Sequence, residues 1–495
     1  MKRRIGLCLV FRDMWQSSCG CFPTVSQLKD LAPFIVSMGC FDRIEANGGA
    51  FEQVCLLRGE NPNVAVRELA RCFHEAGIRT QMLERGLNAL RLNPVSADVR
   101  ELMFMVKKQQ GVDVVRSFCG LNDYRNLRLS VEYAKASGMI SQVALPVVNS
   151  PVHTLDHYMD IVDKVVEYGA DEICLKDMSG QGEPSFMADL THLIRKRYPS
   201  LFIQYHSHCG PASREALLKV VRAGCDAVDV ALGPLSGGAS HPELMEVVDW
   251  LRSDGFLVKD VDVPSYESAV SLLDVCLSEM PTALGKDESC YEQLMNVGLP
   301  GGMMASLRDD IADYNVAVNS SLRLQALPEL SREQFLVRFA DEVKCIWPSL
   351  GYPSMVTPYS QYVASAALSN LLAISKGQPR WSSLSSDVWN MILGRMGRLP
   401  GAVCQELVEL AASMGLEFNV GEPQELYPNV LDRCRSMMEC EGWPVGRDGE
   451  ELLEFAMHES QYRNYMSLLM KPVSELDDGA VYAAISMALH EYLEK

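Results

Sequence analysis

The sequence predicts an α/β protein in which a (β/α)8 TIM barrel is followed by a mainly helical C-terminal domain. Short runs rich in β-branched residues alternate with amphipathic helical segments through the first part of the chain. Eight such units fit into about 250 residues, which is the usual length of this barrel. Beyond about Tyr266 the strand pattern fades and helical periodicity continues.

Each predicted strand is a short apolar run bounded by turn residues. The eight runs are residues 4–10, 41–45, 79–83, 113–117, 140–147, 172–176, 201–206 and 227–232. Because helices separate them, the strands are expected to pair in parallel through right-handed crossovers. An open doubly wound sheet is the alternative, but no G-x-G-x-x-G or Walker sequence follows an early strand.

The helices between these strands include residues 64–76, 127–138, 154–169 and 213–224. Several end at a glycine directly before the next strand, as helix C-termini commonly do. We expect a barrel domain over residues 1–290 and a helical domain over residues 291–495, with a turn at residues 299–302.

Composition limits the functions that the chain can have. A formal net charge of −19 argues against a nucleic-acid partner, since phosphate binding depends on clusters of Lys and Arg. Sixteen cysteines without an export signal indicate a reducing compartment. No apolar run approaches the ~20 residues of a membrane span. The sequence therefore predicts a soluble, cytoplasmic protein.

Metal-capable side chains fall where predicted strands end, which is the side of such a barrel that carries the active site. Asp13 follows the first strand, Lys176 ends the sixth, and His206 and His208 end the seventh. Residues two apart on a strand point to the same face. Two neutral imidazoles with one carboxylate suit a divalent cation such as Zn, Mn or Co. A hydrogen-bonded core histidine is the alternative, but the His-x-His pattern beside Asp13 favours a metal site.

Lys176 has two interpretations from its residue type alone. An ammonium group is repelled by a nearby cation, so an unmodified lysine would bind a phosphate or a carboxylate. Burial lowers the pKa of a lysine, however, and a neutral amine can add CO2 to become an anionic carbamate. The residues alone favour the first interpretation.

The segment FRDMWQS at residues 11–17 resembles the first strand-end motif of the biotin-dependent carboxyltransferases. This family includes the carboxyltransferase domain of pyruvate carboxylase, the oxaloacetate decarboxylase α subunit and the large subunit of transcarboxylase. Further stretches follow in the family's order: EANGGA at 45–50, QMLERG at 81–86, SPVHT at 150–154, LKDMSG at 175–180, HSH at 206–208, PLSGG at 234–238, PGGM at 300–303 and VTP at 356–358.

The resemblance implies a reaction that moves a carboxyl group between biotin and a small 2-oxo acid such as pyruvate or oxaloacetate. The metal ligands that it implies are Asp13, His206, His208 and a carbamylated Lys176. The ion would stabilise the enolate of the 2-oxo acid.

Three further residues match the family's substrate-handling groups. Arg85 matches an arginine that binds the substrate carboxylate, and Gln16 matches a polar group that faces a substrate oxygen. Thr357 matches a threonine that carries a proton between biotin and the enolate. Two alternatives stay open: Arg85 could form a surface ion pair, and Thr357 could simply start a helix.

The chain departs from the family's pattern at positions that border the pocket. Trp15 stands where the family has His, Leu92 aligns with a tyrosine, and Cys209 replaces an Asp. Glu52 is the acidic residue expected after the Gly-Gly stretch, displaced by one position. We therefore expect Trp15 and Leu92 to contact the substrate and to favour a bulkier or less polar 2-oxo acid than pyruvate.

The resemblance also implies partners. Family members that carry their own biotin end in a β-rich domain with an Ala-Met-Lys-Met hairpin, whereas the C-terminal Met-Lys here is Met470-Lys471, followed by Pro472. Biotin is therefore expected on a separate carrier protein. A homodimer and further carboxylase or membrane decarboxylase subunits are the other partners implied.

Two other functions remain as alternatives. A related DRE-type TIM-barrel lyase or Claisen-type synthase also uses Asp and His-x-His, but it has no need of Lys176 or Thr357. A non-catalytic assembly subunit that kept the fold is the second alternative, and the changes at Trp15, Leu92 and Cys209 are its support.

Overall fold

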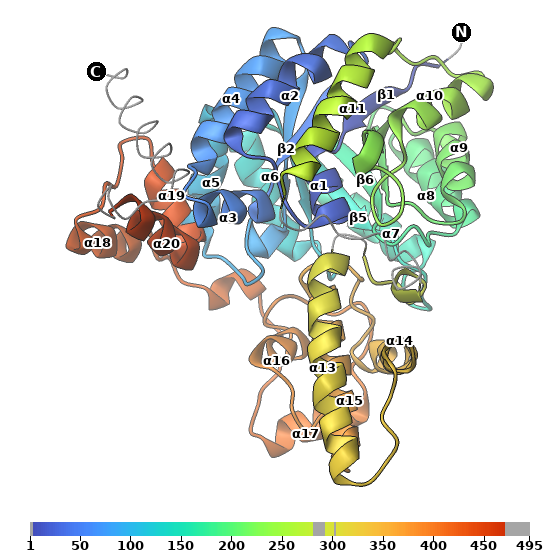
Figure 1. Ribbon diagram of the computed structural model, residues 1–495, viewed down its shortest axis with the longest axis vertical. Helices are drawn as coiled ribbons and strands as arrows, with labels where there is room; N and C mark the ends of the chain where they lie inside the picture. The colour runs from blue at the N-terminus through green and yellow to red at the C-terminus, as the bar shows by residue number, and fades with distance from the viewer. Residues whose placement is uncertain (1–2, 281–292, 301–302, 471–495) are drawn as a thin grey trace.

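The computed structural model describes residues 3–280, 293–300 and 303–470. Eight parallel strands close into a barrel in chain order (Figure 1). Their bounds are β1 Gly6–Leu9, β2 Arg43–Asn47, β3 Arg79–Glu84, β4 Val114–Phe118, β5 Ile140–Pro146, β6 Glu172–Asp177, β7 Phe202–Ser207 and β8 Ala227–Val230. The first strand pairs with the last, with Gly6 opposite Ala227. The predicted barrel is confirmed, and every predicted strand overlaps an observed one.

Helices cover the outside of the barrel. They are α2 Val25–Ser37, α4 Pro62–Glu75, α5 Ala97–Gln109, α6 Arg125–Ala136, α7 Leu155–Glu167, α8 Pro184–Arg197, α9 Ser213–Ala223, α10 Leu244–Ser253 and α11 Val263–Ser278. Local sequence sets several of their starts. Thr24 and Gln27 form a reciprocal capping box at α2, and Thr154 accepts the backbone N–H of His157 at α7.

Charged and amide side chains occupy the interior of the barrel. Arg43 donates to both carboxylate oxygens of Glu172, at 2.8 and 2.9 Å, and Arg116 donates to Asp229 at 2.6 Å. Glutamines from three further strands bridge these pairs: Gln81, Gln142 and Gln204. Because burying an unpaired charge is costly, this interior persists only as a fully connected network.

The described C-terminal helices form two groups (Figure 1). One group lies below the barrel and contains α13 Met304–Leu324, α14 Arg332–Ser349, α15 Tyr359–Ser375, α16 Ser386–Ile392 and α17 Gln405–Ser413. The other lies at the side of the barrel and contains α18 Leu431–Glu441, α19 Glu450–Met457 and α20 Glu459–Leu469. This second group packs on α5 and on α3 (Gly49–Leu57).

The helical character predicted for the C-terminal region is therefore confirmed. The predicted boundary at residues 290 and 291, Gly301-Gly302 of the predicted turn, and Lys471 lie outside the described residues. Among the helices that the structure describes, none combines the length and the apolar character needed to cross a membrane.

Candidate metal centre and active site

Asp13 is carried by α1 (Phe11–Cys19), a short helix that begins directly after β1. Ser17 Oγ donates to Asp13 Oδ1 at 3.0 Å, and Arg12 Nη2 lies 3.2 Å from Oδ2. Burial by itself would raise the pKa of Asp13, but Arg12 and neighbouring histidines hold it well below its usual range. Asp13 is therefore a buried carboxylate anion.

Three imidazoles surround this carboxylate. His206 lies on β7, His208 directly follows that strand, and His241 comes from the loop between β8 and α10. His241 is 4.6 Å from His206 and 4.2 Å from His208 between ring centroids. The nitrogen and oxygen atoms that the four residues offer all lie within 4.8 Å of one another. The structure thus brings Asp13, His206 and His208 together, as predicted, and adds His241.

The hydrogen bonds of the imidazoles leave one nitrogen of each ring free. His206 Nδ1 lies 2.7 Å from Asp229 Oδ2, His208 Nδ1 2.7 Å from the Ala239 carbonyl, and His241 Nδ1 2.9 Å from the Ser207 carbonyl. Each of these acceptors fixes the proton on Nδ1. The three Nε2 atoms are buried and have no hydrogen-bond partner among the described residues.

Burial keeps the rings of His206 and His208 neutral. It lowers the pKa of His208 to about 3, with the neighbouring His241 acting in the same direction. It also lowers the pKa of His206 well below its ordinary value. Three inward-facing Nε2 lone pairs beside one carboxylate are a ligand set for a borderline divalent metal ion.

Lys176 lies at the end of β6, with its Cα opposite that of His206 in the adjacent strand. It shares the inward face of β6 with Glu172, because side chains alternate along a strand. Its Nζ is 4.6 Å from the centre of the Phe118 ring. Burial lowers the pKa of Lys176 to about 8, although the negative charges of Asp13 and Glu45 oppose the shift.

Arg85 directly follows β3 and lacks an acidic partner among the described residues. Its Nη1 donates to the Arg91 carbonyl at 3.3 Å, and its buried Nε has no hydrogen-bond partner there either. Burial lowers the pKa of Arg85 to about 10, and the positive charge of Arg12 acts in the same direction. A Cβ on residue 49 would collide with the Leu90 carbonyl and lie 3.1 Å from Arg85 Nη1. The close approach of Gly49 to Leu90 and Arg85 therefore requires glycine.

Gln16 lies near Asp13 because residues three apart share one side of a helix. Arg12 Nη1 donates to Gln16 Oε1 at 2.6 Å, and Arg12 Nη2 donates to Glu45 at the same distance. The carbonyl end of the Gln16 amide is thereby fixed toward Arg12. Its NH2 end remains able to donate.

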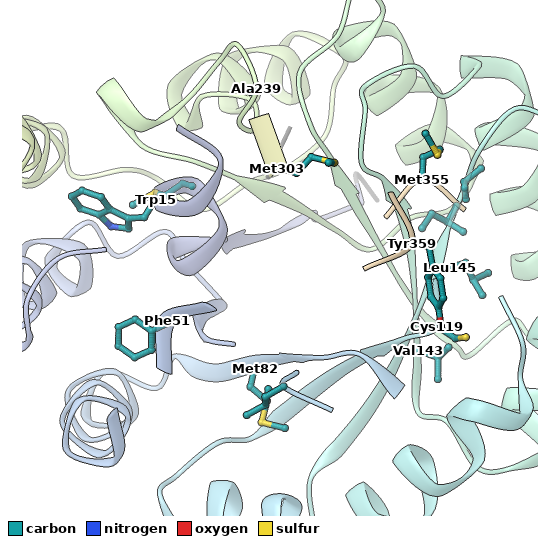
Figure 2. Packing of buried hydrophobic residues seen from close by; sticks show 14 of the residues in the cluster. Trp15, Phe51, Met82, Cys119, Val143, Leu145, Ala239, Met303, Met355 and Tyr359 are labelled. Atoms are coloured by element: carbon teal, nitrogen blue, oxygen red, sulfur yellow. The ribbon is translucent and has the colours of Figure 1, made fainter. Parts of the chain in front are cut away.

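Thr357 reaches the barrel on the segment that precedes α15. Asn122 donates to both the Pro146 carbonyl and Ser354 Oγ at 3.0 Å, which ties this segment to the end of β5. Val356 belongs to one buried cluster with residues of the strands β3 to β6: Leu83, Phe118, Ala144 and Cys174. Figure 2 shows Met355 and Tyr359, on either side of Thr357, beside the barrel wall. Thr357 therefore adjoins Val356, a member of the buried cluster that also contains Phe118, over whose ring Lys176 Nζ lies.

Trp15 and Leu92 lie in different surroundings from the metal ligands. Trp15 is fully buried, and its ring packs edge-to-face on Phe11 with centroids 6.4 Å apart. It is two positions from Asp13 on α1, so the two side chains leave the helix on nearly opposite sides. Leu92 is 39% exposed, and its carbonyl accepts a hydrogen bond from the Tyr362 hydroxyl at 3.2 Å. Their predicted roles in substrate selection stay predictions.

His241 is the member of the cluster that the sequence patterns did not predict. It lies three positions after the PLSGG stretch, in the loop after the last strand. Loops at this end of a barrel build the active site, so a histidine there was a usable signal. It was not part of a His-x-His pattern and therefore did not stand out.

Comparison with known proteins shows that the chain is similar to carboxylases and carboxyltransferases. A model of the conserved carboxylase domain matches residues 295–488. A pyruvate carboxylase subunit of Methanocaldococcus jannaschii is 27% identical over 464 residues, which cover 90% of this chain and 75% of that protein. The methylmalonyl-CoA carboxyltransferase 5S subunit of Propionibacterium freudenreichii is 26% identical over 433 residues, covering 86% and 80%.

Two further comparisons agree with these. The 2-oxoglutarate carboxylase large subunit of Hydrogenobacter thermophilus is 25% identical over 472 residues, covering 90% of this chain and 67% of that protein. The carboxyl transferase domain of Rhizobium etli pyruvate carboxylase, solved with pyruvate and biocytin, superposes with a TM-score of 0.80 at 21% identity. The superposition covers 98% of this chain and 81% of that domain, and the likeness is one of fold.

Proposed function

Because this chain belongs to the biotin-dependent carboxyltransferase family, we propose that it is a carboxyltransferase subunit. It moves a carboxyl group between biotin and a 2-oxo acid of the pyruvate and oxaloacetate class. The observation that carries this proposal is the buried cluster of one carboxylate and three inward-facing imidazoles. Lys176 and Arg85 lie beside this cluster, and Arg85 has no ion-pair partner among the described residues.

In this proposal Asp13, His206 and His208 hold a divalent cation, with Zn, Mn and Co as the candidates. The buried Nε2 atoms, which lack partners among the described residues, fit such an ion. The ion supplies Lewis-acid stabilisation of the negative charge on the 2-oxo acid. Asp229 and the Ser207 and Ala239 carbonyls hold the rings in the orientation that this role needs.

Arg85 binds the carboxylate of the 2-oxo acid. The Arg85 side chain is half-buried with a buried Nε, and it forms no ion pair within the described part of the chain, so an incoming carboxylate would supply its missing counter-charge. Gln16 donates from its NH2 group to a substrate oxygen, since Arg12 occupies its carbonyl end.

The neutral amine of Lys176 would add CO2 and release a proton to form a carbamate, whose anionic oxygen would serve as an additional ligand for the metal ion. Its pKa of about 8 supports this role, because far more of the amine is neutral near pH 7 than in an ordinary lysine, and only the neutral amine reacts with CO2. Mass analysis of protein trapped under CO2 tests this modification separately from the rest of the proposal.

Thr357 moves the proton that carboxyl transfer requires. When the carboxyl group leaves a substrate such as oxaloacetate and joins the ureido nitrogen of biotin, that nitrogen loses a proton and the enolate carbon gains one. The Thr357 hydroxyl, held at the barrel by Val356 and Ser354, passes this proton between the two.

Biotin arrives on a separate carrier protein in this proposal. Three of the relatives support this, since the name of each denotes one subunit of a larger assembly. We further propose a homodimer and a cytoplasmic location. The described cysteines are all free thiols, which suits a reducing compartment. Streptavidin detection of covalent biotin on this polypeptide would contradict the separate carrier.

The test is decarboxylation of oxaloacetate by the purified full chain, with and without free biotin. We expect biotin and a divalent metal to be required together. Thr357→Ala should lower the biotin-dependent rate by about 10²–10⁴-fold, the usual contribution of proton transfer, whereas Thr357→Ser should retain most of it. Metal content should be equal in both variants. The proposal would be overturned if the chain neither decarboxylates oxaloacetate in the presence of free biotin nor carboxylates pyruvate or 2-oxoglutarate when carboxybiotin is supplied as the donor.

A further inference from the structure

His241 contributes a third imidazole to the cluster, and its geometry defines what that ring can do. The side chain is fully buried. Its Nδ1 is 2.9 Å from the Ser207 carbonyl, an acceptor that requires a proton on this nitrogen. Its Nε2 faces Asp13 Oδ2 at 3.6 Å and has no hydrogen-bond partner among the described residues.

This arrangement offers two ligand atoms to a cation. With its proton on Nδ1, the His241 ring presents the lone pair of Nε2 beside a carboxylate oxygen, and both atoms are electron-rich. His206 repeats the situation, because its Nε2 is also 3.6 Å from Asp13 Oδ2 while its Nδ1 is bonded to Asp229. Two lone pairs therefore converge on one carboxylate oxygen in a buried site.

The spacing matches a shared metal ion. Two ligand atoms on a tetrahedral ion with bonds of ~2.0–2.2 Å lie about 3.4 Å apart. The separations of 3.6 Å from Asp13 Oδ2 to His206 Nε2 and to His241 Nε2 are close to this value. The close approach of the His241 ring to His208, at 4.2 Å between centroids, places all three rings around one point.

We propose that His241 is a direct ligand of the metal ion, which is then held by three imidazoles and one carboxylate before Lys176 is modified. The inference rests on the metal site of the proposed function and extends it. Three nitrogens with one oxygen favour Zn or Co over Mg or Ca, which prefer oxygen ligands alone. A carbamate on Lys176 would then be an additional ligand and not the one that secures the ion.

The experiment measures Zn²⁺ affinity of the full chain by competition with a chromophoric chelator, in the absence of substrate and biotin. The variants are His241→Phe, which keeps a ring without nitrogen, and Lys176→Gln. The matched control is His153→Phe, because His153 is likewise buried with an Nε2 that lacks a partner among the described residues, but lies outside the cluster. Circular dichroism checks folding, and His241→Gln serves if the Phe ring disrupts packing.

We expect His241→Phe to weaken Zn²⁺ binding by more than 100-fold, beyond the about 10–100-fold that loss of a residue orienting a ligand costs. His153→Phe should change affinity less than threefold, and Lys176→Gln less than tenfold. The visible spectrum of bound Co²⁺ should change for His241→Phe and for neither of the other two.

Equal Zn²⁺ affinity in the native chain and His241→Phe would overturn the inference, and so would loss of the ion in Lys176→Gln. Because no substrate is present, these results are independent of whether the chain transfers carboxyl groups. A chain that binds Zn²⁺ as described yet lacks biotin-dependent turnover would refute the proposed function alone.

Discussion

His458 Nε2 lies 3.1 Å from Glu52 Oε2, although 406 positions separate the two residues in the chain. Both side chains are buried. Lys107 completes the cluster, with its Nζ 2.8 Å from Glu52 and 3.3 Å from Glu454. Glu52 belongs to α3, Lys107 to α5, and Glu454 to α19. This buried ionic cluster therefore fastens the last described helices to the side of the barrel.

Replacing the cation of this cluster should destabilise the protein. Lys107→Met leaves the buried carboxylate of Glu52 without its lysine counter-charge, and breaking such a pair costs about 3–5 kcal/mol. Lys108→Met is the matched control, since the next residue on the same helix is half-buried and its nearest acid is 4.0 Å away. Denaturant unfolding should show the loss for Lys107→Met and under about 1 kcal/mol for the control. Equal unfolding of both variants would contradict this role of the cluster.

Stability should also depend on pH through Glu454. Burial, with the charge of Glu52 adding to it, raises the pKa of Glu454 to about 8, although Lys107 opposes this shift. Between the ordinary pKa of a glutamate and this value the folded state keeps a proton that the unfolded state has lost. Its contribution to the free energy of unfolding therefore falls as pH rises through this window.

Glu454→Gln mimics the protonated carboxyl and removes this titration. We expect the stability of the variant, relative to the native chain, to increase between pH 5 and pH 8. The other titratable groups around Glu454 include Glu52, Lys107, Glu451, His458, Tyr462, Tyr465 and Cys55. All of them remain in both proteins, so their titrations largely cancel in the comparison. A difference in unfolding free energy that stays constant from pH 5 to pH 8 would show that Glu454 does not titrate in this range.

Arg85 should determine affinity for the 2-oxo acid. Arg85→Lys keeps the charge but loses the planar fork that binds a carboxylate through two parallel hydrogen bonds. We expect kcat/KM to fall by about 30-fold or more, which corresponds to about 2 kcal/mol. The control is Arg79→Lys, at the exposed opposite end of the same strand, which should keep kcat/KM within twofold. An unchanged KM in Arg85→Lys would contradict carboxylate binding at this residue.

Leu92 should influence which 2-oxo acid is used. Apolar lining discriminates by shape, at about 1–3 kcal/mol per methylene, and we expect longer or branched 2-oxo acids to be relatively better substrates than oxaloacetate. Leu92→Tyr should shift the ratio of kcat/KM back toward oxaloacetate. Trp15→Phe tests the other position. Because Trp15 is packed in the core, we expect this variant to lose stability and to keep the selectivity of the native chain. If oxaloacetate is the best substrate and Leu92→Tyr leaves the ratio unchanged, Leu92 does not line the substrate pocket.

The barrel could be predicted from sequence because its information is local. Each strand is a short apolar run, and each crossover helix has its own periodicity and cap, as at Thr24 and Thr154. The strand-end positions of Asp13, Lys176 and His206 followed from the same pattern. The TIM-barrel rule then predicted that these side chains would converge at one end of the barrel.

Other features depend on contacts that no local pattern encodes. His241 reaches the cluster because the loop after β8 folds back until its backbone neighbours β7, and its ring then bonds to the Ser207 carbonyl. The division of the C-terminal helices into two groups depends likewise on what they pack against. The pairing of Glu52 with His458 is a clear case, because each residue alone is an ordinary acid or base in a helical region.

The placement of the metal-capable residues has a consequence for the order in which the site is made. His241 is the last of the four possible ligands along the chain, and Thr357 follows it by more than a hundred residues. Chains are synthesised from the N-terminus and their domains generally fold as units. A nascent chain therefore holds every side chain of the histidine and aspartate cluster before the ribosome has added Thr357, to which we assign the proton transfer. If the cluster binds the proposed ion, its capture would precede the docking of the C-terminal helices, and the bound site could then template that docking.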